Sequence, residues 1–260
     1  MKKSTSLRKN ALITSVIMLL VAVTALTGAT YAWFSSEPSA STADIEMTTT
    51  AIQGLYLAEG GLSDAEPKTQ YTSYLNWTAP SGTFAPVSSS FSGNTDFYTT
   101  SSKLPSGAYE DAPITKAEAY TFEAPTKEGA SYFARKIWLK GDVAAGETKD
   151  IVATFKQDGK AQYHRIAIID CADMADGLSA EDVKLIAPNA NPYYALGSTG
   201  VTNVQLTPST EKASVPMGSI TGDEVKEFLV FFYFEGQDAT CITANSGQDA
   251  TAGITFAFAE

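Results

Sequence analysis

The chain has 260 residues, 44% of them hydrophobic, and carries 29 Asp and Glu against 18 Lys and Arg, a formal net charge of −11. This excess of carboxylates repels the phosphates of nucleic acids and argues against a nucleic-acid-binding function. The chain has only one histidine, His164, and two cysteines, Cys171 and Cys241, so it has few candidate residues for the common metal-binding and nucleophilic sites.

The N-terminus has the three parts of a secretory signal peptide. Four basic residues come first, namely Lys2, Lys3, Arg8 and Lys9. An uncharged run of 26 residues follows at positions 11–36, with small residues just before Trp33. We therefore expect residues 1–32 to be a signal peptide cleaved between Ala32 and Trp33, and the protein to be secreted, extracellular or at the cell surface. A retained membrane anchor is the alternative, since such a run can span about 30 Å of hydrocarbon.

Two motifs carry a resemblance to a known family. The residues Thr30-Tyr31-Ala32-Trp33-Phe34-Ser35, directly after the apolar run, resemble the cleavage region of TasA/camelysin-type exported proteins of Gram-positive bacteria. The end of the chain, where Glu235-Gly236-Gln237-Asp238 and Cys241 separate two apolar stretches, is similar to that of surface proteins of the same group. The resemblance implies processing by a SipW-type signal peptidase and a role as an exported subunit of surface or biofilm-matrix fibres.

After the leader, residues 33–43 are Ser-rich and contain Pro38, which predicts a flexible, extended N-terminal arm. Its two aromatic residues, Trp33 and Phe34, suit a segment that docks into a partner. Residues 44–59 alternate apolar and polar side chains, with Ile45 and Met47 on one parity, and predict strands with one buried face. A glycine at position 54 marks a bend between the halves of this region.

Residues 60–110 are mostly polar and contain many Pro and Gly, which predicts a long irregular insertion with one or two short strands. Residues 115–124 are compatible with helix or strand. Aromatic residues in predicted loops could stack on sugar rings or anchor a protein interface, with packing at the edge of the core as the alternative. They are Trp77, Tyr98, Tyr109, Tyr193 and Tyr194.

The rest of the chain predicts strands and turns. Strands are predicted at 132–140, 151–155, 163–169, 201–206, 228–234 and 254–258, and one short helix at 179–185. Gln157-Asp158-Gly159-Lys160 predicts a hairpin that pairs 151–155 with 163–169. The run 228–234 is apolar and aromatic throughout and predicts a central strand covered on both faces. We therefore expect an all-β fold over residues 44–260, an antiparallel β-sandwich of jelly-roll or immunoglobulin-like type with long loops.

The two cysteines can pair if the protein is exported. A disulfide between Cys171 and Cys241 would close a loop of about 70 residues and add roughly 4 kcal/mol to stability on the chain-entropy model. Two separate buried thiols are the alternative.

Neither a catalytic nor a cofactor site is predicted. Camelysin-type relatives have been described as metalloproteases, but the chain has one histidine and no His-Glu-x-x-His motif, and a catalytic zinc usually takes three protein ligands. A solvated strand position is expected for His164. The acidic cluster Asp170, Asp173 and Asp176 has carboxylates of the kind that calcium takes but not the spacing of an EF-hand, so a solvated loop is expected. We therefore expect no enzyme, no metal and no cofactor.

Without its four leader cations the chain keeps 14 Lys and Arg against 29 Asp and Glu, a net charge of −15. We expect a noncatalytic fibre subunit that self-associates or binds other surface proteins, and that meets the membrane only through its leader before cleavage. In this hypothesis the segment from Trp33 to Thr50 adds as a strand to an open sheet edge of the next subunit. Its contact residues are Trp33, Phe34, Ile45 and Met47. The alternative is a membrane-anchored surface module that binds a glycan or a protein.

Overall fold

The computed structural model describes residue 18 and most of residues 41–260. The gaps are 43–44, 53, 79–81, 84, 90, 92–94, 100–114, 128, 160–162, 177, 179–181, 188–202, 206–211, 237, 239–240, 242–247, 249 and 260. Apart from Met18, the predicted signal peptide lies outside the described residues, as do residues 33–40 and 43 of the predicted arm.

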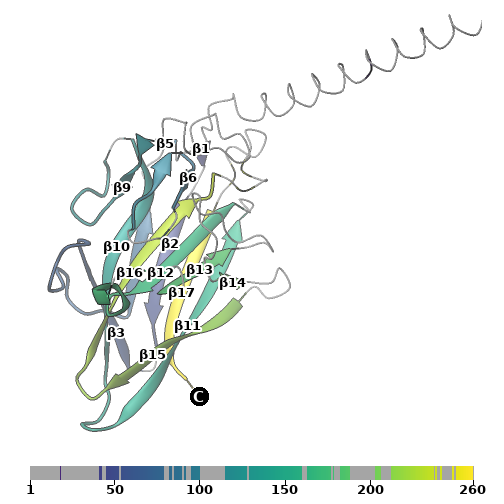
Figure 1. Cartoon of the computed structure of the whole chain (residues 1–260). Coiled ribbons are helices and arrows are strands. Elements are labelled where there is room, and N and C mark those ends of the chain that lie inside the picture. Colours follow the sequence, from purple (N-terminus) through teal and green to yellow (C-terminus); the bar gives the residue numbers. More distant parts are fainter. Residues whose placement is uncertain are drawn as a thin grey trace, which may run out of the picture.

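Two β-sheets pack face to face (Figure 1). The first has the strand order β14-β13-β12-β16-β10-β3, with β9 also paired to β10. Its strands are β14 (Asn203–Gln205), β13 (Val183–Ala187), β12 (His164–Asp170), β16 (Val225–Phe234), β10 (Ala130–Gly141), β3 (Leu55–Gly60) and β9 (Glu118–Tyr120). The second has the order β15-β11-β17-β2-β4. Its strands are β15 (Lys212–Thr221), β11 (Thr148–Gly159), β17 (Ala250–Phe258), β2 (Ile45–Ala51) and β4 (Tyr74–Thr78).

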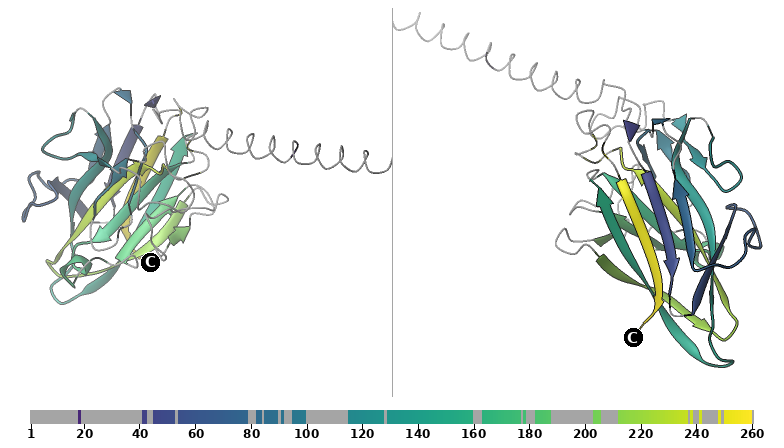
Figure 2. Two further views of the ribbon diagram at one scale, coloured as in Figure 1. Left: turned by 45° about the horizontal axis from the view of Figure 1, so that its top comes forward. Right: turned by 180° about the vertical axis from the view of Figure 1, so that it is seen from behind.

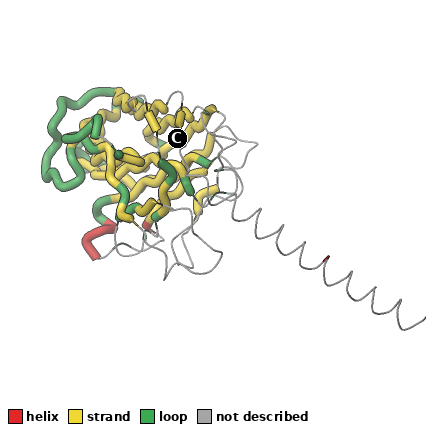
Figure 3. Tube along the Cα trace, turned by 90° about the horizontal axis from the view of Figure 1, so that it is seen from above, coloured by secondary structure: helices red, strands yellow, loops and turns green. Residues whose placement is uncertain are grey.

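Two small sheets and one short helical turn complete the described elements. One sheet joins β6 (Val87–Ser88), β7 (Tyr98–Thr99) and β8 (Thr115–Lys116), and the other joins β1 (Ser41–Thr42) to β5 (Gly82–Thr83). The 3-10 turn η1 (Asp173–Asp176) lies at the margin of the sandwich when the molecule is seen from above (Figure 3). The predicted fold class, an all-β sandwich with mostly antiparallel pairing, is confirmed.

Strand β16 is the centre of the first sheet, as its apolar sequence predicts. Its residues from Phe228 to Phe234 are all buried, and it lies between β12 and β10. On the face toward the second sheet, the Phe228 ring stacks on Phe256 of β17 with 5.7 Å between centroids. Alternate side chains point to opposite faces of a strand, so Phe231 and Tyr233 lie on the outer face of the first sheet.

A segment from the predicted insertion covers that outer face at one end. We call residues 85–99 the covering segment. Phe97 packs against Tyr132, Phe231 and Tyr233, with ring centroids 4.2, 5.5 and 4.8 Å apart, and Phe91 lies 5.5 Å from Phe97. Residues 60–110 thus carry β4, β5, β6 and β7 rather than the one or two short strands predicted. The doubly covered central strand is confirmed because this segment supplies its second cover.

The predicted hairpin at residues 157–160 is wrong. Strand β11 continues to Gly159 and pairs with β15 and β17, whereas β12 pairs with β13 and β16 in the other sheet. The connection therefore crosses between the two sheets. The Asp-Gly turn signal is local, and the long-range pairing of a strand that buries Ile151, Ala153 and Phe155 outweighs it.

Three other elements were mispredicted or left open. The helix predicted at 179–185 is wrong over its described end, where β13 pairs with β12 and buries Val183, Leu185 and Ile186. Strand β15 was not predicted, since its run of Ser, Pro and Gly weakens the alternation. The ambiguous stretch 115–124 contains the strands β8 and β9. The strands predicted at 132–140, 201–206 and 254–258 correspond to β10, β14 and β17.

The first predicted strand region is confirmed as β2 and β3, with Gly54 between them at a φ of 83° that favours glycine. Seen from behind, β2 lies beside β17 (Figure 2), and the two run parallel. Beyond β3 the chain returns at Thr72, which exchanges two backbone hydrogen bonds of 2.7 Å with Leu57. It then enters β4 of the second sheet. Residues 71–78 therefore link the two sheets on this side of the sandwich.

Candidate functional site

The residues predicted for the assembly arm fall in two places. The cleavage position Ala32-Trp33 and the tip residue Phe34 lie outside the described residues. Ile45 begins β2, where it pairs with Ala250, and Met47 is fully buried between the sheets. Strand β2 pairs on both sides within its own chain, so Met47 is a core residue in this fold and does not face a partner.

The two cysteines are free thiols. Cys171 follows β12 directly, beside Glu227, whereas the Cys241 amide bonds to Asp238 beyond the other end of that strand. Seven strand residues separate these positions, a span of roughly 20 Å, and a disulfide requires Cα atoms within about 7 Å. The suggested pairing is therefore corrected to its alternative, two separate thiols. Burial raises the pKa of Cys171 to about 11 and that of Cys241 further still.

The histidine is not solvated, contrary to expectation. His164 is buried, and its ring stacks on Phe232 with centroids 5.8 Å apart. In the described part of the chain, no group of three or more His, Cys, Asp and Glu side chains is placed to hold a metal ion.

The acidic cluster is partly neutralised by a lysine. Asp170 Oδ2 accepts a hydrogen bond from Lys226 Nζ at 2.8 Å, and its Oδ1 accepts one from the Ala172 amide at 3.0 Å. Asp173 is exposed at the start of η1, and partial burial followed by the charge of Asp170 raises its pKa. Asp170 therefore closes the end of β12 through a hydrogen bond to the Ala172 amide and an ion pair with Lys226.

Of the five predicted loop aromatics, the structure describes Trp77 and Tyr98. Trp77 lies in β4 with 4% of its surface exposed, and its indole Nε1 donates a hydrogen bond of 2.7 Å to Glu59 Oε2. Tyr98 lies in β7 and is half-buried. The other three, Tyr109, Tyr193 and Tyr194, lie outside the described residues.

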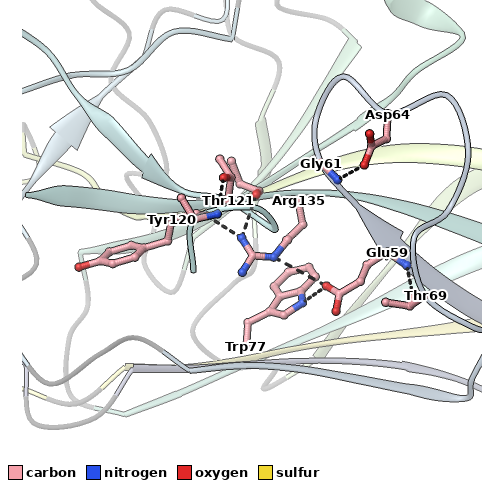
Figure 4. A network of polar contacts seen from close by, with 10 residues as sticks. Glu59, Gly61, Asp64, Thr69, Trp77, Tyr120, Thr121 and Arg135 are labelled. Carbon is pink, nitrogen blue, oxygen red and sulfur yellow. Dashed lines mark hydrogen bonds and ion pairs between the residues drawn. The ribbon is translucent and has the colours of Figure 1, made fainter. Parts of the chain in front are cut away.

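A buried arginine lies between the sheets beside Trp77 (Figure 4). Arg135 of β10 donates a hydrogen bond to the Tyr120 carbonyl at 2.6 Å, and its Nε lies 3.7 Å from Glu59 Oε2. Its guanidinium lies over the Trp77 ring, 5.7 Å from the centroid. Burial lowers the pKa of Arg135, and the charge of Glu59 opposes that shift. Through these contacts Arg135 links β10 to β3, β4 and β9. It does so between the part of β10 that pairs with β9 and the part that pairs with β3.

A second buried pair lies under the covering segment. Arg165 of β12 is fully buried and donates hydrogen bonds to Asp238 and to the His164 carbonyl. Ser88 of the covering segment donates a hydrogen bond to Glu235, which follows β16. The Ser88 bond, together with a hydrogen bond of 3.0 Å from the Gly236 amide to the Val87 carbonyl, ties the covering segment to the chain that follows β16. Both buried arginines face carboxylates, an arrangement that suits structural ties because neither cation is left alone in the interior.

Sequence analysis did not identify these charged pairs, although a signal for them exists. Arg135 has the same parity as the inward-facing Phe133 and Ile137, and Glu59 has the parity of Leu55 and Leu57. A charged residue on the apolar parity of a strand predicts a buried partner of opposite sign. Which two such residues meet depends on strand pairing.

Five exposed large apolar side chains gather at the end of the sandwich away from β1. We call Ile52, Tyr56, Tyr71, Tyr74 and Val225 the end patch; they are 36–49% exposed. Tyr56 and Val225 both flank Lys140 in the register of the first sheet. Tyr71 and Tyr74 stand on either side of Thr72, which pairs with Leu57, and Ile52 lies in the turn between β2 and β3. No other large apolar side chains in the described part of residues 41–260 are exposed.

The charges around the end patch are unevenly paired. Lys136 forms an ion pair with Glu227 and donates to the Asp64 carbonyl at 2.9 Å. Partial burial and then the charge of Glu227 raise the pKa of Tyr71. Lys140, between Tyr56 and Val225, forms no ion pair or hydrogen bond with any residue that the structure describes. Lys140, Tyr56 and Val225 therefore share the outer face of the first sheet, whereas Tyr74 lies on the outer face of the second sheet.

In comparisons with known proteins, no protein-family model, no curated protein and no solved structure matches the chain. Over the residues that the structure describes, the search for a helix long and apolar enough to cross a membrane found none. The surface feature that remains for function is the end patch, since the strongest charge pairs lie in the interior.

Proposed function

We propose that the mature protein is an exported, noncatalytic subunit of a surface or extracellular-matrix fibre, released by a SipW-type signal peptidase and assembled through its N-terminal arm. The observation that supports this proposal most is that the second sheet has two edge strands, β15 and β4. Among the described strands, each of them pairs with a neighbour on one side only. Such edges accept an extended segment through backbone hydrogen bonds, as in β-strand addition.

The pairing of β2 within its own chain shortens the N-terminal segment that is free to bind a neighbouring subunit. Because Ile45 and Met47 belong to the sheet of their own chain, and Ser41–Thr42 pair with β5, the segment available for a neighbour is residues 33–40. Trp33 and Phe34 then supply most of its apolar surface, and Trp is among the residues that most often dominate binding energy in interfaces.

The test uses the purified chain 33–260, with a chain that lacks residues 33–40 as its matched control. Size-exclusion chromatography and negative-stain microscopy should show concentration-dependent filaments for the first and monomers for the second, which retains β1 and all later strands. A chain 33–260 that stays monomeric at high concentration would contradict the proposal.

A second candidate is a membrane-anchored binding module that keeps its leader. The exposed Tyr56, Tyr71 and Tyr74 favour it, because exposed aromatic rings stack on sugars and anchor protein interfaces. The N-terminal sequence of the protein purified from membranes separates the two: an intact Met1 or Lys2 supports the module, and Trp33 supports the fibre subunit.

A further inference from the structure

The outer face of the second sheet carries a row of hydroxyl groups. The register of its five strands places one outward-pointing side chain of each strand side by side. Neighbours in this row are about 4.8 Å apart, because that is the distance between paired strands. Seen from behind, the sheet has β17 and β2 in its middle (Figure 2). We call the five residues the hydroxyl row; from β15 to β4 they are Ser214, Thr154, Thr255, Thr50 and Tyr74.

The hydroxyl row is accessible to a ligand. Ser214 and Tyr74 are exposed, and the three threonines are half-buried. Thr154 and Ser214 share one hydrogen bond of 3.0 Å between their hydroxyls. The side-chain hydroxyls of Thr50 and Thr255 form no hydrogen bond with any residue that the structure describes. A threonine hydroxyl can both donate and accept, so the row offers hydrogen bonds of both kinds.

The row contains no charged residue, although the chain as a whole has a net charge of −11. The carboxylates of Glu46 and Asp150 lie on the same face but two rows away, roughly 13 Å along the strands. One cation, Lys156, is exposed in the adjacent row. The acidic chain repels a polyanion, and the row has no carboxylate for a cation, so its chemistry suits a neutral ligand.

A glycine lies beside the middle of the row. Gly253 is in the central strand β17, two residues before Thr255 and paired with Thr48. Its φ is not positive, and a Cβ there would lie 3.4 Å from Thr48 Oγ1 and 3.9 Å from Lys156 Cβ, which are ordinary contact distances. The fold therefore does not require glycine at this position. A glycine inside a strand weakens the strand and often marks a place where a ligand approaches the backbone closely.

The spacing and chemistry of the row fit a linear polysaccharide. Pyranose rings joined by β-1,4 links form a flat, extended chain, and one ring is about as long as the ~4.8 Å between strands. Such a chain laid across the sheet would place one ring over each strand, with its hydroxyls beside those of the row. The ring of Tyr74, 49% exposed at the end of the row, offers a stacking surface for a sugar. A second copy of this protein fits less well, because protein interfaces have an apolar centre.

We propose that the hydroxyl row and Gly253 form a binding surface for a neutral β-1,4-linked polysaccharide, which lies across the five strands with one ring stacked on Tyr74. This inference goes beyond the proposed fibre role and does not depend on it. Water competes for each hydroxyl, so a single hydrogen bond contributes little, and affinity comes from the number of rings bound.

The first test measures how binding depends on ligand length. Isothermal titration calorimetry of the purified chain 33–260 uses β-1,4-linked oligomers of glucose and of N-acetylglucosamine, from two to six units long. We expect affinity for one or both series to rise with length and to level off at about five units, because five strands contribute to the row. The affinity should not change with salt, since the ligand is neutral.

Three variants test the location. Thr154→Glu should weaken binding about tenfold, because it puts a carboxylate in the row. Its matched control is Thr148→Glu, in the same strand but outside the row, whose hydroxyl also pairs with one on β15, that of Thr221 at 2.8 Å; it should bind normally. Tyr74→Ala should weaken binding roughly three- to tenfold.

Gly253→Thr separates a ligand role from a structural one. Threonine favours strands more than glycine does, so the variant should unfold at the same or a higher temperature. Its side chain would stand in the path of the sugar chain, so we expect roughly tenfold weaker binding. Lower stability with unchanged binding would show that the glycine serves the fold, and would overturn the inference.

The remaining outcomes are also decisive. No binding of either oligomer series would overturn the surface, as would equal losses in Thr154→Glu and Thr148→Glu, or preference for an anionic polysaccharide such as alginate. Thr154→Glu that abolishes self-association of the chain and leaves sugar binding intact would assign the face to a second copy instead. Filaments without sugar binding would overturn this inference and leave the fibre role standing.

Discussion

The outer face of the first sheet has a covered half and an open half. At the covered half, Tyr132, Phe231 and Tyr233 lie under Phe97 of the covering segment. At the open half, the same strands and their neighbour β3 present Lys140, Val225 and Tyr56 to solvent. In the open half Trp138 is still buried, with 2% of its surface exposed, and the exposed part is the last row, formed by Lys140, Val225 and Tyr56. The covering segment therefore excludes solvent from one half of this face and leaves the row at the other end accessible.

The two halves should differ most in how much stability is lost when one aromatic side chain in each is replaced by alanine. Phe97→Ala removes a buried ring and leaves a cavity over β16, so we expect a loss of about 3–5 kcal/mol in the free energy of unfolding. Tyr56→Ala, the matched change in the open half, should cost less than about 1 kcal/mol. Urea unfolding monitored by circular dichroism measures both. Equal losses would show that the open half is packed as tightly as the covered one.

Two of the three cations of β10, Arg135 and Lys140, give a second contrast. Arg135→Met should destabilise the fold by about 3 kcal/mol, because Glu59 and the Tyr120 carbonyl lose their buried partner. Lys140→Met, on the open half of the same strand, should change stability by no more than about 0.5 kcal/mol. The same unfolding series measures both variants. A neutral Arg135→Met would mean that the ion pair is replaceable by packing alone.

Alkaline pH should act on the covered half. Burial raises the pKa of Tyr132 and of Tyr163 to about 12, so the folded state keeps both phenols neutral while the unfolded chain ionises near pH 10. The stability they contribute is present below pH 10 and is lost as pH rises from 10 to 12, by roughly 1–3 kcal/mol for each. Unfolding curves across this range, with tyrosinate absorbance, measure the effect. Stability that stays level up to pH 12 would contradict it.

The smallest effect concerns the thiols and leaves stability unchanged. Cys171, half-buried beside Glu227 near the open half, has a pKa of about 11, so little thiolate exists at pH 8. Cys241, near the covered half, is buried more deeply and has a higher pKa. Iodoacetamide should modify Cys171 before Cys241, with both rates rising with pH, and mass spectrometry of the native protein measures the order. A disulfide in that protein would contradict the separation of the thiols.

Local patterns predicted much of the fold because side-chain alternation is a property of each strand alone. The alternation at residues 44–59 and the apolar run at 228–234 correspond to β2, β3 and β16. Which strands pair with one another was harder to predict. The Asp158-Gly159 signal predicts a tight turn, but residues in β11 pair with strands that lie about 60 to 100 positions later in the chain. A window of sequence around the turn does not contain those partners.

The candidate site shows the same limit. Trp33 and Phe34 can be singled out from the sequence as an aromatic arm tip, and they remain part of the proposal. The exposed residues at the other end of the sandwich could not be grouped that way, because they come from three separate segments, around residues 52–56, 71–74 and 225. Met47 was assigned to the arm since it continues the β-prone stretch, and pairing of β2 with β17 and β4 makes it a core residue.

By itself the sequence determined the all-β class, the position of most long strands and the central place of β16, because these follow from short-range alternation and from the length of apolar runs. The tertiary structure alone decided which strands pair, that the covering segment closes one half of the outer face, that Arg135 meets Glu59, and that the cysteines lie apart. Each of these is a contact between residues distant in sequence, and it exists only once two sheets bury a common core.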